Sequence, residues 1–158
     1  MIYANLRGLP ALRLHPLFSS NSRVSAVDTI LPTGGGHDGC SPVFVPVGSK
    51  IITSFYTLHR QPSVFGKDVE TFNPDRWDHI SPDSWEFMPF SHGPRSCAGR
   101  YKALTEASYI IGRLADKYAR IESQDDQPWT EDVKLVVKNF NGCKVSLYAH
   151  EKKETLKC

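Results

Sequence analysis

The sequence has no long hydrophobic run. None of its stretches reaches 18 consecutive apolar residues, and residues 1–7 lack the apolar region of a secretory signal. A helix that crosses a bilayer needs about 20 mainly apolar residues, so the sequence predicts no membrane span. With neither a signal nor an anchor, we expect this chain to be cytoplasmic.

Cysteine is scarce, and its spacing is irregular. The four cysteines are Cys40, Cys97, Cys143 and Cys158, and no two of them form a Cys-x-x-Cys pair. This spacing argues against a structural zinc site. Four cysteines suffice for two disulfides, but no signal sequence indicates an oxidising compartment, so we expect free thiols.

An excess of charge of one sign is also absent. The chain has 19 Lys and Arg against 17 Asp and Glu, a net charge of +2. This balance argues against nucleic acid as a partner. Hydrophobic residues make up 40% of the chain and charged residues 23%, which is typical of a globular protein rather than a disordered one. At 158 residues the chain is long enough to bury a core.

One segment has a strong helical period. Apolar side chains recur at every third or fourth position from Ala98 to Tyr118, which predicts a long helix with one apolar face. Near the N-terminus, residues 2–14 predict a helix that is broken or restarted near Gly8-Leu9-Pro10 and ends at Pro16.

The other predicted elements are short. Alternation and β-branched residues predict strands at residues 23–30, 50–56, 133–138 and 143–148. Residues 32–39 are rich in glycine and predict a loop. Asn141-Gly142 accepts the positive φ angles of a tight turn, so the last two strands are predicted to pair as a hairpin.

The segment Phe90–Arg100 places a cysteine directly before the predicted long helix. Cys97 would then lie at the positive end of the helix dipole, near unpaired N–H groups, and both effects favour the thiolate. Gly93, followed by proline, favours a tight turn that would direct backbone amides towards the sulfur, and such bonds tune a metal thiolate. Gly99 would let a flat ligand approach the helix closely.

Two further side chains of this segment suit a haem. Arg95 offers a fork of donors for a carboxylate such as a haem propionate, and Phe90 can shield the sulfur from water. A single cysteine at a helix is more often a buried small hydrophobe than a ligand. The full pattern F-x-x-G-x-R-x-C-x-G meets five requirements at fixed spacing, and therefore favours a ligand.

This pattern is where the chain resembles a known family. The haem-binding signature of the cytochromes P450 is matched by Phe90, Gly93, Arg95, Cys97 and Gly99. The resemblance implies an α+β fold, mainly α, that forms the C-terminal part of the P450 domain over residues 1–150. It would contain the end of the K helix, short β-strands, the haem-thiolate loop, the L helix and a C-terminal β-hairpin. Residues 151–158 would be a charged tail, expected to fray.

Two other segments resemble elements of the same family. Leu12–Pro16 resembles the end of the K helix, where the family has an E-x-x-R pair, and Phe72–Trp77 resembles its F-x-P-x-R-[WF] element. In the family the Glu and two Arg form a buried ionic triad, of which Arg13 and Arg76 match two members. Pro10 stands in the place of the Glu and cannot pair with Arg13. The sequence thus predicts two like charges without their carboxylate, which is costly if they are buried.

The resemblance implies a haem-thiolate monooxygenase. Such an enzyme inserts one oxygen atom from O2 into an organic substrate, with haem b (iron protoporphyrin IX) ligated through its iron by the Cys97 thiolate. Arg23 lies ten residues after Arg13, where many family members have an Arg that binds a haem propionate. Electrons from NADPH would arrive through NADPH-cytochrome P450 reductase, which Arg95, Arg100 and Lys102 would attract.

Substrate and location follow from finer similarities. Residues 31–36 and 104–109 look similar to fungal P450s that hydroxylate alkanes and fatty acids, so a small lipophilic substrate is expected. Residues 17–22 and 128–130 are the stretches that would reach it. A full-length parent would lie on the cytosolic face of the endoplasmic reticulum membrane.

We expect this chain to be truncated and inactive by itself. By resemblance it lacks the membrane anchor, the oxygen-activating helix and most of the substrate pocket. The apolar stripe through Leu104 and Ile111 would then be exposed. Two alternatives stay open: a non-catalytic truncated remnant, and a haem-binding protein without monooxygenase activity.

Overall fold

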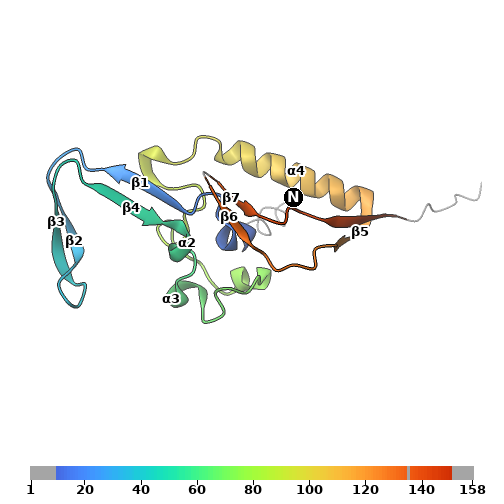
Figure 1. Cartoon of the computed structure of the whole chain (residues 1–158), viewed down its shortest axis with the longest axis horizontal. Coiled ribbons are helices and arrows are strands. Elements are labelled where there is room, and N and C mark those ends of the chain that lie inside the picture. The colour runs from blue at the N-terminus through green and yellow to red at the C-terminus, as the bar shows by residue number, and fades with distance from the viewer. Residues whose placement is uncertain (1–9, 135, 151–158) are drawn as a thin grey trace, which may run out of the picture.

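The computed structural model describes residues 10–134 and 136–150. Within these ranges the chain forms one long helix, several short helical turns and four separate two-stranded antiparallel sheets, arranged along an elongated molecule (Figure 1). The accessible surface of the chain is 12,421 Å². A compact monomer of the same mass exposes about 7,900 Å². Much of the apolar surface is therefore not packed within this chain.

The N-terminal half contains two β ribbons. Residues 10–14 are helical, and β1 (Ser20–Val24) then pairs with β4 (Lys50–Ser54). Between them, β2 (Thr29–Gly35) and β3 (Ser41–Val45) form a hairpin that extends away from the rest of the molecule (Figure 1). The single strand predicted over 23–30 is therefore wrong, since β1 ends at Val24 and β2 begins at Thr29.

The glycine-rich segment 32–39 was predicted to be a loop, but it is a loop only in part. Residues up to Gly35 belong to β2, with an irregular register between Leu31 and Gly35. A Cβ atom at Gly35 would lie 2.8 Å from the Pro42 carbonyl oxygen, so the absence of a side chain is what lets the strands approach here.

The strand predicted over 50–56 is confirmed only as far as Ser54. The Ser54 hydroxyl accepts a hydrogen bond from the Thr57 N–H at 3.2 Å and caps α2 (Phe55–Leu58), which ends the strand. Three short helical turns follow before the long helix: α3 (Pro62–Phe65), η1 (Pro74–Asp78) and η2 (Gly93–Arg95).

The predicted long helix is confirmed as α4 (Arg100–Lys117), although Tyr118 belongs to the next strand. The helix runs directly into β5 (Tyr118–Ser123), which pairs with β8 (Val145–Ala149). None of its residues is buried, and Ile111 is 51% exposed. The predicted exposure of the apolar stripe is thus confirmed at Ile111, whereas Leu104 is half-buried.

The predicted C-terminal hairpin is wrong in its pairing. The segment expected to be one strand contains two, β6 (Glu131–Val133) and β7 (Val137–Asn139), which pair with each other. The turn at Asn141-Gly142 does form, with the Gly142 N–H donating to the Asn139 carbonyl at 3.2 Å. It leads out of β7 towards β8, whose partner is β5, a strand that the sequence analysis did not recognise.

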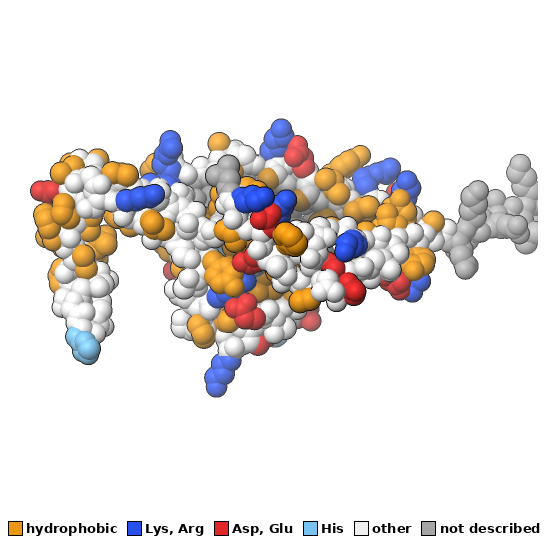
Figure 2. All heavy atoms as spheres, in the orientation of Figure 1, with side chains coloured by type: hydrophobic (Ala, Val, Ile, Leu, Met, Phe, Trp, Pro, Cys, Tyr) orange, Lys and Arg blue, Asp and Glu red, His pale blue; other side chains and the backbone are white. Residues whose placement is uncertain are grey.

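The buried part of the described chain is small. Its buried aliphatic and aromatic side chains are Leu14, Val45, Phe55 and Phe65. Apolar side chains cover much of the β2–β3 hairpin surface and also lie exposed around α4 (Figure 2). The architecture is α+β, with more strand than the mainly α expectation. None of the described helices is long and apolar enough to span a bilayer.

Candidate functional site

The first feature of the site is a buried arginine near the N-terminus. Arg13 is 1% exposed, and its guanidinium donates to the carbonyl oxygens of His59 (3.1 Å), Val69 (2.7 Å) and Thr71 (3.2 Å). Burial, and next the charge of Arg76, lower the pKa of Arg13 to about 10, so the side chain remains cationic at neutral pH. Three carbonyl dipoles therefore compensate a charge for which no carboxylate was found in sequence.

Pro10 does not disrupt the turn that carries Arg13. Residues 10–14 are helical, Pro10 is fully buried, and the His15 N–H donates to the Ala11 carbonyl at 2.8 Å. The described helical turn begins at Pro10, and the predicted break near Gly8-Leu9-Pro10 falls mostly on residues 1–9, which lie outside the described residues.

The second arginine has the carboxylate that the sequence analysis missed. Arg76 is 7% exposed and forms a two-pronged ion pair with Asp68, with both N–O distances at 2.8 Å. It also donates to the carbonyl oxygens of Phe65, Asp68 and Thr71. The hydrogen bonds from Arg76 lower the pKa of Asp68. The prediction of two uncompensated charges is thus wrong; Asp68 lies on a loop, where no spacing rule marks it.

A buried histidine, also missed from sequence, connects these arginines to the next segment. His59 is fully buried, and its Nε2 accepts the Met88 N–H at 3.0 Å. Its ring lies 5.0 Å from that of Phe87, centroid to centroid. Burial, and next the charges of Arg13 and Arg60, lower its pKa to about 4, so the ring is neutral at physiological pH.

The segment from Phe90 to Cys97 forms a closed loop. The Cys97 N–H donates to the Phe90 carbonyl at 2.9 Å, which joins the two ends. Inside the loop, Ser91 and Gly93 have φ angles of 60° and 75°, in the left-handed region. The tight turn expected at Gly93 is present as η2, where the Ser96 N–H donates to the Gly93 carbonyl at 3.0 Å. Only glycine adopts such an angle without strain, which explains Gly93.

Cys97 lies at the open end of this loop. Its thiol is free and exposed, and the Arg100 N–H at the start of α4 donates to its carbonyl at 3.3 Å. A Cβ atom at Gly99 would lie 3.8 Å from the Cys97 sulfur, so a longer side chain there would extend beside the sulfur. Arg95 is exposed within the loop, and Phe90 is half-buried. The arrangement leaves the sulfur accessible to a ligand of considerable size.

Arg23 comes from β1 and lies near the start of the same loop. Its guanidinium donates to the Asn21 side chain (2.8 Å) and to the Ser22 carbonyl (2.9 Å). It lines a hollow of about 150 Å³ together with Ser91 and His92, the first turn of the cysteine loop. The structure therefore brings Arg23 to the edge of the loop that carries Arg95 and Cys97.

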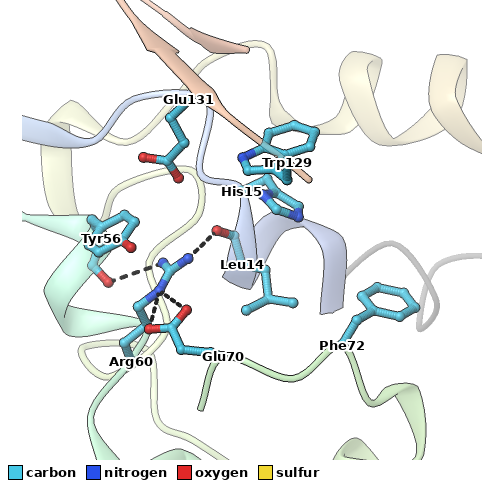
Figure 3. A pocket seen from close by; sticks show the side chains of 8 residues that line it. All are labelled: Leu14, His15, Tyr56, Arg60, Glu70, Phe72, Trp129 and Glu131. Carbon is cyan, nitrogen blue, oxygen red and sulfur yellow. Dashed lines mark hydrogen bonds and ion pairs between the residues drawn. The ribbon is translucent and has the colours of Figure 1, made fainter. Parts of the chain in front are cut away.

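A second hollow, of about 410 Å³, lies between the N-terminal helical turn, residues 56–72 and the start of β6 (Figure 3). In its centre Arg60 pairs with Glu70 (3.0 Å), donates to the Leu14 carbonyl (2.7 Å), and lies 3.6 Å from the ring centroid of Tyr56. At the far wall the rings of His15 and Trp129 are 4.0 Å apart. The residues in this hollow already contact one another, and they join the N-terminal turn to the C-terminal strands.

Comparison with known proteins assigns the family. The family model for cytochrome P450 matches residues 11–146. The chain belongs to the cytochrome P450 family. The matched range contains the whole cysteine loop and both buried arginines, and Pro10 lies one position before it.

Several fungal P450s are similar to this chain over most of its length. The cytochrome P450 monooxygenase himC of Aspergillus japonicus is 48% identical over 136 residues, which are 86% of this chain and 24% of that protein. Cytochrome P450 monooxygenase FPY7 of Fusarium mangiferae is 46% identical over 136 residues, which are 86% of this chain and 26% of that protein. Cytochrome P450 52A13 of Debaryomyces hansenii is 42% identical over 138 residues, which are 86% of this chain and 27% of that protein. The chain spans about a quarter of the length of these relatives.

The P450 family implies a haem, and the cysteine loop suits one. The described residues contain no group of three or more His, Cys, Asp or Glu side chains that could hold a metal ion. A single accessible thiolate instead suits a metal that brings its other ligands with it, as haem iron does. Gly99 leaves space beside the sulfur, and exposed arginines on the loop and on β1 suit two propionates.

Proposed function

We propose that this chain is the haem-thiolate part of a P450 monooxygenase that inserts one oxygen atom from O2 into an organic substrate. The observation that carries the proposal is the free, exposed thiol of Cys97, at the end of a loop closed on Phe90 and directly before α4. Family membership and the similarity to fungal monooxygenases support it. In this proposal residues 10–14 correspond to the end of the family's K helix and α4 to its L helix.

Each residue of the loop has a proposed task. Cys97 would hold the haem iron through its sulfur, Gly93 forms the turn, and Gly99 keeps the space beside the sulfur free. Arg95 and Arg23 bind the propionates, and Phe90 excludes water from the sulfur. When bound, the haem supplies the activation of O2, and the thiolate favours cleavage of the O–O bond.

Substrate and redox partner are proposed by similarity to the fungal relatives. We infer a small lipophilic substrate, a fatty acid or alkane. The side chains of Leu17 and Phe18 are exposed and would offer apolar surface to such a substrate. The Leu17 carbonyl accepts the Val137 N–H at 2.8 Å, which joins this apolar segment to β7. Residues 128–130 are proposed to reach the substrate as well.

Electrons from NADPH would arrive through NADPH-cytochrome P450 reductase. Arg95, Arg100 and Lys102 support docking of an acidic surface, because all three are exposed beside Cys97. The parent enzyme is proposed to lie on the cytosolic face of the endoplasmic reticulum membrane.

One observation favours the alternative of a non-catalytic chain without haem. No residue of α4 is buried, so the helix that follows Cys97 has little packing to hold it in place. The third reading, a haem-binding protein without monooxygenase activity, shares the site and differs only in turnover.

The carbon monoxide spectrum of the haem-loaded, reduced chain tests the proposal. We expect the strongly red-shifted Soret band of a thiolate-ligated haem, lost in Cys97→Ala and kept in Cys143→Ala, which changes another free and exposed cysteine. A chain that binds no haem contradicts the proposal and supports the non-catalytic alternative. Turnover of a fatty acid with reductase and NADPH then separates a monooxygenase from a haem-binding protein.

A further inference from the structure

A continuous set of hydrogen bonds links the buried arginine Arg13 to the cysteine loop. Arg13 donates to the His59 carbonyl at 3.1 Å, and the His59 ring accepts the Met88 N–H at 3.0 Å. The Met88 carbonyl in turn accepts the Ser91 N–H at 3.0 Å, one residue after the start of the loop. His59 is thus the side chain through which the buried cluster holds the backbone that enters the loop.

The His59 ring is rigidly held. It is fully buried and lies near two aromatic rings, with centroid distances of 5.0 Å to Phe87 and 6.2 Å to Phe55. The backbone N–H of His59 donates to the Phe55 carbonyl at 3.0 Å, and Arg13 donates to the backbone carbonyl of His59. With both backbone groups hydrogen-bonded, the ring buried and its Nε2 bonded to Met88, the ring nitrogen is held in place.

The loop that it meets needs such a support. Ser91 has a φ of 60°, a conformation that persists in a residue other than glycine only where the surroundings hold it. Most residues of the loop after Gly93 are exposed and contribute little packing. At its C-terminal end the loop leads into α4, and at its N-terminal end the contact at Met88 joins it to the buried cluster.

The acceptor nitrogen is the feature that a histidine adds at this position. Since Nε2 accepts the Met88 N–H, the proton of the neutral ring lies on Nδ1, which is buried and has no partner among the described residues. A phenylalanine would fill the same space without burying an unpaired N–H. The low pKa of His59, about 4, keeps Nε2 available as an acceptor.

We propose that His59 is a positioning residue that, by accepting the Met88 amide, holds the cysteine loop in the conformation that presents Cys97 to the haem. The proposal rests on the proposed function for the role of Cys97. The contact itself can be tested without haem.

The test compares two substitutions of His59 in the haem-free full chain. His59→Phe keeps an aromatic ring and loses the acceptor, whereas His59→Gln keeps an acceptor near the position of Nε2. His79→Phe is the matched control, because His79 is exposed. Amide hydrogen exchange is measured along the chain, together with the alkylation rate of Cys97 by iodoacetamide after Cys40, Cys143 and Cys158 are changed to serine.

We expect His59→Phe to raise the exchange of residues 88–97 at least about tenfold and to change the Cys97 alkylation rate, with residues 69–71 unaffected. His59→Gln should restore most of the protection, and His79→Phe should match the parent chain. Unchanged exchange in His59→Phe overturns the proposal, as does a Met88 amide unprotected in the parent chain. Equal loss of protection along the whole chain, without recovery in His59→Gln, overturns it too, because His59 is then only a core residue.

Haem binding by the same variants separates this proposal from the proposed function. We expect His59→Phe to weaken haem binding and to reduce the thiolate-type carbon monoxide band, with recovery in His59→Gln. If the parent chain binds no haem but the exchange pattern is as expected, the proposed function fails and the contact stands. If the parent chain binds haem and His59→Phe binds it equally well with the same band, only the positioning role is overturned.

Discussion

The buried arginine cluster and the cysteine loop solve opposite problems within one chain. In the cluster, Arg13 and Arg76 are nearly inaccessible to water, and every carbonyl or carboxylate that they contact is supplied by the chain itself. In the loop, Cys97 is exposed and α4 behind it has no buried residue. The cluster provides the packing, and the loop leaves Cys97 exposed. His59 is where the two regions meet.

In this chain, the region with the most specific sequence pattern is not the region with the most packing. The loop has the most specific sequence pattern in the chain and little packing of its own. The cluster contains polar partners that no motif marked, yet it holds several segments together. The predictions below weaken one region while leaving the other intact.

The largest effect is expected from Arg13→Ala. The substitution leaves three carbonyl oxygens of a buried site without their charged donor and opens a cavity, so the free energy of unfolding should fall by at least about 3 kcal/mol. Urea denaturation measures it. Arg113→Ala, in which an exposed arginine of α4 is removed, should change stability by less than about 0.5 kcal/mol. Equal losses in the two variants would contradict the assignment of the cluster as the rigid region.

Acid should weaken the cluster next. The pKa of His59 is about 4 in the folded chain and 6.5 ordinarily, so between these values the unfolded chain binds more protons. The contribution of His59 to the free energy of unfolding is therefore fully present above about pH 6.5. It decreases as the pH falls towards 4, by up to about 3 kcal/mol. Denaturation at a series of pH values measures this, and His59→Gln should remove most of the dependence in that window. A dependence unchanged in His59→Gln would show that another group is responsible.

A smaller effect is expected from Asp68→Asn. The change removes the charge from a two-pronged ion pair but leaves Arg76 its carbonyl acceptors, so the free energy of unfolding should fall, and by more than in the control. Asp116→Asn is the control, since it changes an exposed pair within α4 and should cost only about 0.3 kcal/mol. The two values would be equal if the pair with Arg76 were no more than a surface contact.

The smallest effects separate the loop from its helix. Gly93 has a φ of 75°, so Gly93→Ala should cost about 1 kcal/mol and change the alkylation rate of Cys97. Gly112 lies inside α4, where an added Cβ would meet no atom within 4 Å, and Gly112→Ala should stabilise the chain by about 1 kcal/mol. Thermal unfolding distinguishes them by sign. A stabilising Gly93→Ala would contradict the left-handed turn.

What could be predicted from sequence was local. The period from Ala98 predicted α4, and Gly93 predicted the turn, because both depend on residues close together in the chain. The pairing of β5 with β8 joins segments more than twenty residues apart, and the Asn-Gly turn pointed to the wrong partner. Pairing of this kind depends on which edges pack in space, which local patterns do not encode.

The partners of the arginines were missed for a similar reason. No motif in the sequence distinguishes Asp68 from the other carboxylates. The backbone carbonyls that accept hydrogen bonds from Arg13 leave no signal in the sequence, because every residue has one. His59 lies in a polar stretch without periodicity, so its burial could not be read from its neighbours. The sequence pattern marked Cys97, whose role as a haem ligand stays a prediction, and missed the buried residues that support its loop.

The most direct test of the account is the iron X-ray absorption spectrum of the haem-loaded chain. We predict one sulfur neighbour of the iron, present in the parent chain and in Cys143→Ala and absent in Cys97→Ala. An iron with only nitrogen and oxygen neighbours, or a sulfur signal that survives Cys97→Ala, would contradict the assignment of Cys97 as the haem ligand.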